Sequence, residues 1–92
     1  MIAWICQVVQ VTSKANRSPT REDLGKAIRS VRKDKRLSPR KLAERSGLHQ
    51  TYVAGLESGS RNPTWTVLGT VCEALDVSLI ELVEQAEGHA RG

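Results

Sequence analysis

The sequence predicts an all-α fold, a compact five-helix domain with a non-helical arm at its N-terminus. Ninety-two residues are enough for one modest hydrophobic core and exclude a second domain. Aromatic residues are scarce, with two Trp, one Tyr and no Phe, so the core must consist of Leu, Val, Ile and Ala, which suits packed helices. Apolar residues also recur at helical spacing between short polar loops. We assign residues 1–19 to the arm and linker, 20–87 to the domain and 88–92 to a frayed tail.

The first helix is expected to begin near Thr20 or Arg21 and to end between residues 34 and 36. Thr20 and Asp23 resemble a capping box in which Asp replaces Glu. The inner stripe of this helix follows the i, i+4, i+7 pattern: Leu24, Ile28 and Val31.

Two short helices joined by a tight turn are expected next. Ser38 caps the first of them, and Pro39 occupies its first position, where a missing N–H does no harm. It runs to about Ser46, and Gly47 in the turn can adopt a positive φ. The second runs from about His49 to Ser58, with Gly59 as a left-handed C-cap. The residues that pack these two helices together are Leu42, Ala43, Val53 and Leu56.

Two further helices complete the expected domain. Thr64 caps the fourth helix, and Ser78 forms a capping box with Glu81 at the start of the last. The inner stripe of the fourth helix consists of Val67, Leu68, Val71, Cys72 and Leu75. The last helix is expected to bury Leu79, Leu82 and Val83 before it frays from Gly88.

The first twelve residues are rich in β-branched side chains and lack a partner strand in an otherwise helical chain. Three interpretations remain open: an arm that pairs with a second protomer, a flap packed on the domain, or a disordered leader left by a start codon assigned too far upstream. We expect a poorly ordered arm, followed by a polar linker from Ser13 to Pro19.

Charge divides the chain into a basic and an acidic part. Residues 14–45 carry twelve basic and four acidic side chains, a net charge of +8, whereas the remainder carries −4. A concentrated basic surface is typical of a protein that binds a polyanion. The third helix adds a small outward surface without charge, formed by His49, Gln50, Thr51, Ala54 and Gly55, which suits entry into a DNA groove.

Other classes of protein are disfavoured. The two His and two Cys are scattered without metal-ligand spacing, and no nucleophile–base pair or phosphate-binding Gly loop is present, so we expect no enzyme, no metal and no cofactor. Two cysteines do not form a disulfide framework. The apolar start of the chain is too short to cross a membrane and lacks the features of a signal peptide. We therefore expect a cytoplasmic protein, associated with the nucleoid when bound to DNA.

Between Leu24 and Val83, about two thirds of the chain, several motifs occur in a fixed order: LAERSG, TYVAGLESG, RNP and ALDVS. This stretch resembles the Cro/C1-type (Xre-type) helix-turn-helix regulators, and TYVAGLESGSRNPT is most similar to restriction-modification controller proteins and phage regulators. The resemblance implies a lambda-repressor-like domain that binds double-stranded DNA, with residues 49–58 as a recognition helix in the major groove.

The resemblance also implies roles for individual residues. Gln50 and Thr51 stand where the family reads bases, and their chemistry suits adenine and the thymine methyl. His49 lies near a phosphate or base edge, or is a solvated surface residue. A glycine inside a helix indicates a close approach, so Gly55 is assigned to a DNA strand or base edge, or to neutral drift.

Phosphate contacts are assigned to residues before, within and after the recognition helix: Ser38, Arg40, Lys41, Tyr52, Arg61 and Asn62. Tyr52 either supports the recognition helix or reaches a phosphate with its hydroxyl. Asn62 also serves the turn before the fourth helix. Glu57 is expected to form a structural ion pair with Arg32 rather than to contact DNA.

Two positions depart from the pattern of the family. Many relatives carry Gln where this chain has Pro39, and that Gln contacts phosphate and braces the recognition helix. Others carry Gly where this chain has Arg36, so the turn after the first helix must either be built differently or tolerate a strained residue.

We expect a regulator that binds an inverted-repeat operator as a homodimer through Leu79, Ile80 and Val83. Two alternatives remain. One is an antitoxin that regulates its own synthesis through the same motif and holds a toxin or other protein elsewhere, for example on residues 1–11. The other is a protein-interaction module that kept the fold and lost DNA binding.

Overall fold

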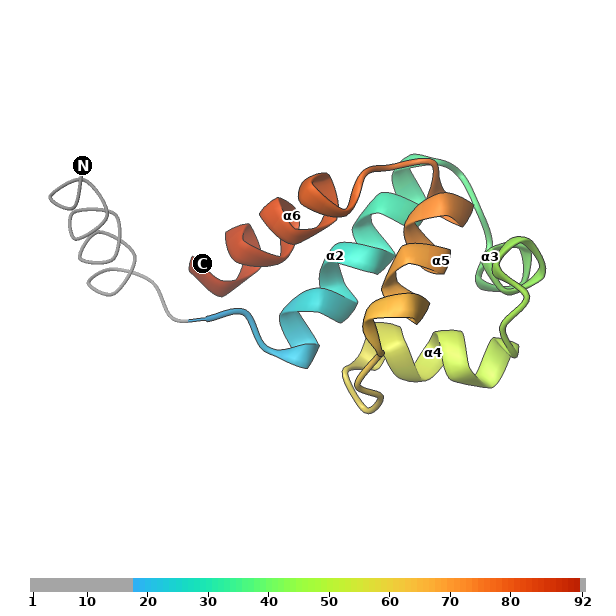
Figure 1. Cartoon of the computed structure of the whole chain (residues 1–92), viewed down its shortest axis with the longest axis horizontal. Helices are drawn as coiled ribbons and strands as arrows, with labels where there is room; N and C mark the ends of the chain where they lie inside the picture. The colour runs from blue at the N-terminus through green and yellow to red at the C-terminus, as the bar shows by residue number, and fades with distance from the viewer. Residues whose placement is uncertain (1–17, 92) are drawn as a thin grey trace, which may run out of the picture.

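A computed structural model of the chain describes residues 18–91, so the predictions for residues 1–17 lie outside the described part. Within the described part there are five α-helices and no strand (Figure 1). They are α2 (Arg21–Asp34), α3 (Pro39–Ser46), α4 (Gln50–Ser58), α5 (Trp65–Leu75) and α6 (Leu79–Arg91). The predicted all-α fold is confirmed.

The predicted caps define the starts of the helices. Thr20 and Asp23 form a reciprocal capping box, in which the Thr20 N–H donates to Asp23 Oδ2 at 2.9 Å and the Asp23 N–H donates to Thr20 Oγ1 at 3.2 Å. Ser78 and Glu81 form another at the start of α6. These polar side chains satisfy N–H groups that a helix cannot pair internally. Each of these helices therefore begins where the sequence predicts.

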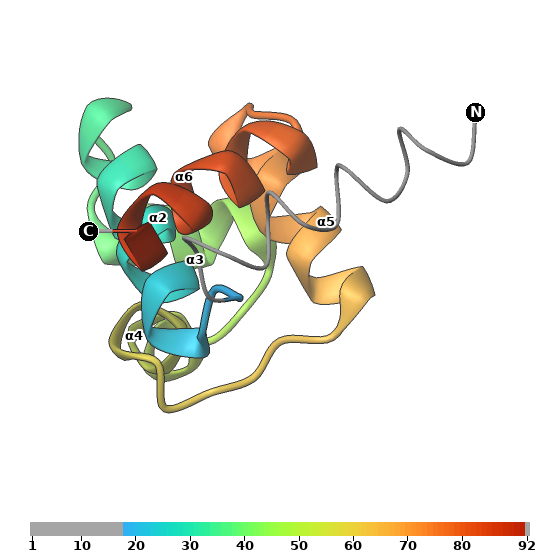
Figure 2. The ribbon, with the colours of Figure 1, turned by 90° about the vertical axis from the view of Figure 1, so that its left-hand side faces the viewer.

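Helix α2 is the centre of the packing. It packs against α6 and α4, while α3 packs against α4 and α5. The two short helices lie at one side of the molecule, and α6 runs along the other (Figures 1 and 2). Fully buried aliphatic side chains fill the space between them: Ile28, Leu42, Val53, Val71, Leu75 and Leu82.

Gly25 allows α2 and α4 to approach closely. A Cβ atom at this position would lie 2.4 Å from the carbonyl oxygens of both Leu56 and Glu57. Backbone oxygens of a packed helix cannot move aside as a flexible side chain can. This contact is not among those expected from the sequence, although a glycine in a helix interior is a signal for it.

Helix α6 differs from the prediction in two respects. Leu82 and Ala86, four residues apart, face α2 and are buried, whereas Val83 is 40% exposed. Because neighbouring residues of a helix are about 100° apart, the residue after Leu82 turns away from α2. The predicted burial of Val83 is therefore wrong. The helix also continues through Gly88 to Arg91, where a frayed tail is expected from the sequence. The positive charge of Arg91 favours this helical end because it complements the partial negative charge there.

Of the two possibilities left open for the turn after α2, the structure shows the strained one. Arg36 has a φ of 60°, in the left-handed region that glycine adopts more easily than any other residue. The backbone N–H of Leu37 donates to the Arg32 carbonyl at 3.0 Å and closes the turn. The chain thus accepts a strained arginine there.

Candidate nucleic-acid interface

The turn between α3 and α4 sets the position of the second helix. Gly47 ends α3 with a φ of 71°, and the Leu48 N–H donates to the Ala43 carbonyl at 3.1 Å. Ala43, Val53 and Leu56 are buried where the helices pack. This geometry confirms the predicted pair of short helices and holds α4 against the core by one face only.

The other face of α4 begins with exposed polar residues. His49 is the N-cap and makes no side-chain capping hydrogen bond, so the helix begins one residue later than predicted. Gln50, Thr51 and Ala54 are exposed, and the first turn contains no acidic residue. The surface that we assigned to base reading is therefore open at these positions.

Gly55 does not belong to that surface. It is buried, and a Cβ atom built on it would lie 2.5 Å from Cγ of Arg61 and 3.2 Å from Oγ of Ser60. The close approach inferred from a helical glycine is real, but the approaching group comes from the loop after α4. The prediction that Gly55 touches a base is wrong because this loop covers it.

The N-terminal end of α3 carries two of the predicted phosphate ligands. Arg40 and Lys41 are exposed, and both lie near the carboxylate of Glu44, at 3.6 Å and 3.7 Å. Ser38 accepts a hydrogen bond from the Lys41 backbone N–H at 3.0 Å, which makes it a helix cap. Exposed pairs of this kind contribute little to stability, so both cations can exchange Glu44 for a stronger anion.

The loop after α4 supplies a third cation. The guanidinium carbon of Arg61 lies 5.7 Å from the centre of the half-buried Tyr52 ring. Tyr52 packs against the core, which agrees with the supporting role that we considered for it. Asn62 is exposed and borders an apolar hollow of about 260 Å³, together with Leu24, Leu68 and Val83.

Glu57 is turned away from the exposed face. Its carboxylate accepts hydrogen bonds from Nε and Nη2 of Arg32, at 2.6 Å and 3.0 Å. Nη1 of Arg32 donates to the Leu37 carbonyl at 2.8 Å. The predicted structural ion pair is confirmed, and it neutralises the one acidic side chain of α4.

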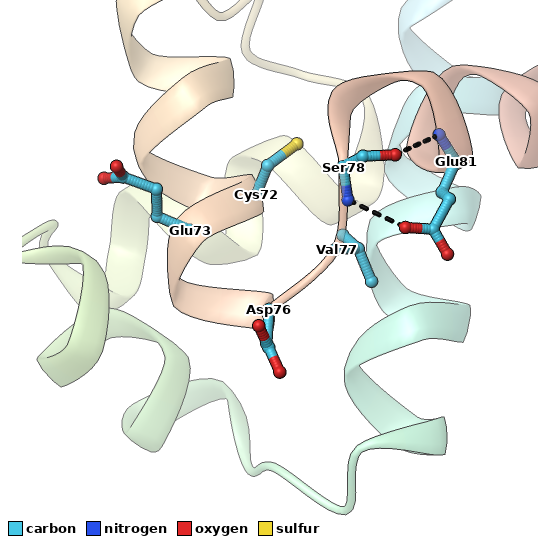
Figure 3. Close-up of a pocket in the computed structure, with 6 residues that line it drawn as sticks. All are labelled: Cys72, Glu73, Asp76, Val77, Ser78 and Glu81. Atoms are coloured by element: carbon cyan, nitrogen blue, oxygen red, sulfur yellow. Dashed lines mark hydrogen bonds between the residues drawn. The ribbon is translucent and has the colours of Figure 1, made fainter.

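A second hollow, of about 550 Å³, lies between α5 and α6 on another part of the molecule (Figure 3). It contains Cys72 and three carboxylates, those of Glu73, Asp76 and Glu81. Burial raises the pKa of the Cys72 thiol, which disfavours the reactive thiolate. Glu81 is occupied in capping α6 (Figure 3). Among residues 18–91, no group of three or more His, Cys, Asp or Glu side chains could hold a metal ion, and no helix is long and apolar enough to cross a membrane.

Taken together, the packed α3–turn–α4 unit, the exposed polar start of α4 and the flanking cations define a helix-turn-helix protein. The family profile for helix-turn-helix domains matches residues 28–82. The chain therefore belongs to this family of DNA-binding transcriptional regulators, as its resemblance to Cro/C1-type proteins implied.

Two curated relatives are 40% identical to this chain over 63 residues, which is 68% of its length. One is the HTH-type transcriptional regulator y4dJ of Sinorhizobium fredii, of which 82% is covered, and the other is the control protein C.SmaI of Serratia marcescens, of which 75% is covered. The resemblance to controller proteins is thus confirmed.

Solved structures are similar in fold. The restriction-modification controller protein C.AhdI of Aeromonas hydrophila is 37% identical with a TM-score of 0.66, covering 67% of this chain and 94% of that one. The controller protein C.Esp1396I, crystallised as a tetramer with its natural 35-base-pair operator, is 28% identical with a TM-score of 0.73, covering 78% and 95%.

Proposed function

We propose that this protein binds an inverted-repeat operator as a homodimer, acts on the nucleoid in the cytoplasm and has no catalytic activity of its own. One observation carries the proposal: the exposed start of α4 is polar and uncharged, cations flank it, and Arg32 neutralises the acidic residue behind it. Such a helix can enter the major groove without bringing a carboxylate toward the bases. The operator complex of the related C.Esp1396I supports the proposal that this chain binds an operator.

Gln50 and Thr51 are the proposed base-reading residues. Both are exposed in the first turn of α4, the part of a recognition helix that usually contacts base edges. A glutamine amide can pair with N6 and N7 of adenine, and the threonine methyl can contact the thymine methyl. His49 precedes them at the N-cap and can donate to a base edge or a phosphate.

Arg40, Lys41 and Arg61 are the proposed phosphate ligands, with Ser38, Tyr52 and Asn62 beside them. The three cations are exposed on the helix before α4 and on the loop after it. Each neutralised phosphate releases condensed counterions, so affinity should fall steeply as salt increases. Because these contacts do not distinguish bases, they position α4 rather than select the operator.

The proposed dimer surface is on α6. Ile80 is 71% exposed and Val83 is 40% exposed, one turn apart on the helix, with Leu79 half-buried beside them. Two copies related by a two-fold axis would present two recognition helices to half-sites about one helical turn apart.

Selection of bound sites from random duplex DNA tests this proposal. We expect enrichment of two short half-sites in inverted orientation. Enrichment of a single half-site would contradict the dimer, and recovery of random sequence with salt-independent binding would contradict the DNA-binding role itself.

A further inference from the structure

The carbonyl oxygen of Gly55 anchors the loop that follows α4. It accepts hydrogen bonds from the backbone N–H groups of Ser60, at 2.9 Å, and Arg61, at 3.1 Å. The hydroxyls of Ser58 and Ser60 also donate to it, at 3.2 Å and 3.4 Å. One acceptor thus holds the backbone of the loop at the residue that bears the cation.

The same glycine makes room for the side chain of Arg61. The Cγ atom of Arg61 lies 2.5 Å from where a Cβ of Gly55 would be, and its Cβ atom lies 3.5 Å away. The aliphatic stem of Arg61 therefore occupies the space that any larger residue would fill. Since glycine costs about 1 kcal/mol relative to alanine in a helix interior, this close packing gives a physical reason for its presence.

The charged end of Arg61 rests over Tyr52. The guanidinium carbon is 5.7 Å from the ring centre, within the range of a cation–π contact. Tyr52 lies one turn before Gly55 on the same side of α4 and packs against the hydrophobic core. The ring is consequently a fixed support rather than a mobile surface side chain.

We propose that Gly55 and Tyr52 are positioning residues that hold Arg61 in place for a DNA phosphate. The inference rests on the proposed function, in which Arg61 contacts the backbone. A free arginine side chain loses much rotamer entropy when it binds, whereas one that is already held by its backbone, stem and charged end loses less. Gly55 thus serves DNA binding without touching DNA.

Double-mutant cycles test the proposal on the full chain. Binding of Gly55→Ala, Arg61→Ala and the double variant to a mixed-sequence DNA duplex is measured by fluorescence anisotropy over a range of salt concentrations. We expect Gly55→Ala to weaken binding about threefold to tenfold in the presence of Arg61 and to change it less than twofold in the Arg61→Ala background, where the Cγ atom is gone. Arg61→Ala should also reduce the salt slope by about one. Gly69→Ala is the matched control, since nothing lies within 4 Å of the added Cβ.

A second cycle separates positioning from direct contact and does not depend on the folding of Gly55→Ala. Tyr52→Leu and Tyr52→Phe are compared in the same two backgrounds. A loss of affinity caused by positioning disappears when Arg61 is absent, whereas a loss of a phosphate contact by the Tyr52 hydroxyl persists. Two results would overturn the proposal. One is a loss of affinity that is equal in the Arg61 and the Arg61→Ala backgrounds, and the other is unchanged affinity for Gly55→Ala or for Tyr52→Leu in the presence of Arg61. If the wild-type chain does not bind DNA, the proposed function fails instead.

Discussion

Arg32 of α2 and Glu57 of α4 form a bidentate ion pair, and their side chains are 8% and 11% exposed. The third donor group of Arg32 holds the Leu37 carbonyl in the turn before α3. One guanidinium therefore connects α2, the recognition helix and the segment that leads into α3. The orientation of the exposed face of α4 depends on this connection.

Replacing Glu57 with alanine should lower the free energy of unfolding by roughly 3 kcal/mol, because a nearly buried arginine loses its partner. For a domain of this size, the melting temperature should fall by about 10 °C or more. Thermal unfolding followed by circular dichroism measures the change. Glu44→Ala, which removes an exposed pair with Arg40, is the control and should cost less than about 1 kcal/mol. Equal losses of stability in the two variants would contradict the structural role of Glu57.

Gly25→Ala should destabilise the fold, because the added Cβ would meet two carbonyl oxygens of α4 at 2.4 Å. Because the helices are forced apart, the free energy of unfolding should fall by about 1 to 3 kcal/mol. In contrast, Gly69→Ala adds a methyl group to an open position within α5 and should stabilise the helix by about 0.5 to 1 kcal/mol. Chemical denaturation of both variants gives the comparison, and shifts of the same sign would be evidence against the close α2–α4 approach.

The cap of α6 should give a pH-dependent contribution to stability. The backbone N–H of Ser78, followed by its hydroxyl, lowers the pKa of Glu81 below its ordinary value. A lowered pKa in the folded state stabilises the fold above the ordinary pKa, and this contribution is lost as the pH falls through the folded-state pKa. The stability difference between wild type and Glu81→Ala should therefore be largest near neutral pH and shrink in acid. Urea titrations from neutral to acidic pH, with Glu84→Ala as control, test this; a constant difference would be inconsistent with the cap.

A charge placed on the exposed face of α6 should separate the proposed dimer. Ile80→Asp should sediment as a single chain of 10.1 kDa, whereas the wild type should sediment at twice that mass. Gln85→Asp adds the same charge at another exposed position of α6 and serves as the control. A dimeric Ile80→Asp would place the contact on a different surface.

Local signals in the sequence predict most of this fold. The capping residues Thr20, Ser38, Thr64 and Ser78 act on the N–H groups next to them, so short sequence patterns are sufficient to locate the starts of α2, α3, α5 and α6. The resemblance to a family supplied the pairing of Arg32 with Glu57, which lie 25 residues apart.

The contacts that local sequence patterns do not predict are long-range or depend on the path of a loop. Gly25 and Gly55 carry the same signal, a glycine inside a helix, but the approaching group is a neighbouring helix in one case and the following loop in the other. Val83 was assigned to the core from its spacing, although only the direction of α2 decides which side of α6 is covered. Such facts depend on the relative placement of elements rather than on their local pattern.

Site selection with single substitutions shows directly whether the first turn of α4 reads bases. Gln50→Ala and Thr51→Ala proteins are each used to select sites from random duplex DNA, and their affinity for mixed-sequence DNA is measured in parallel. Each variant should lose its preference at one position per half-site and retain its non-specific affinity. An unchanged preference in both variants would show that neither Gln50 nor Thr51 reads a base.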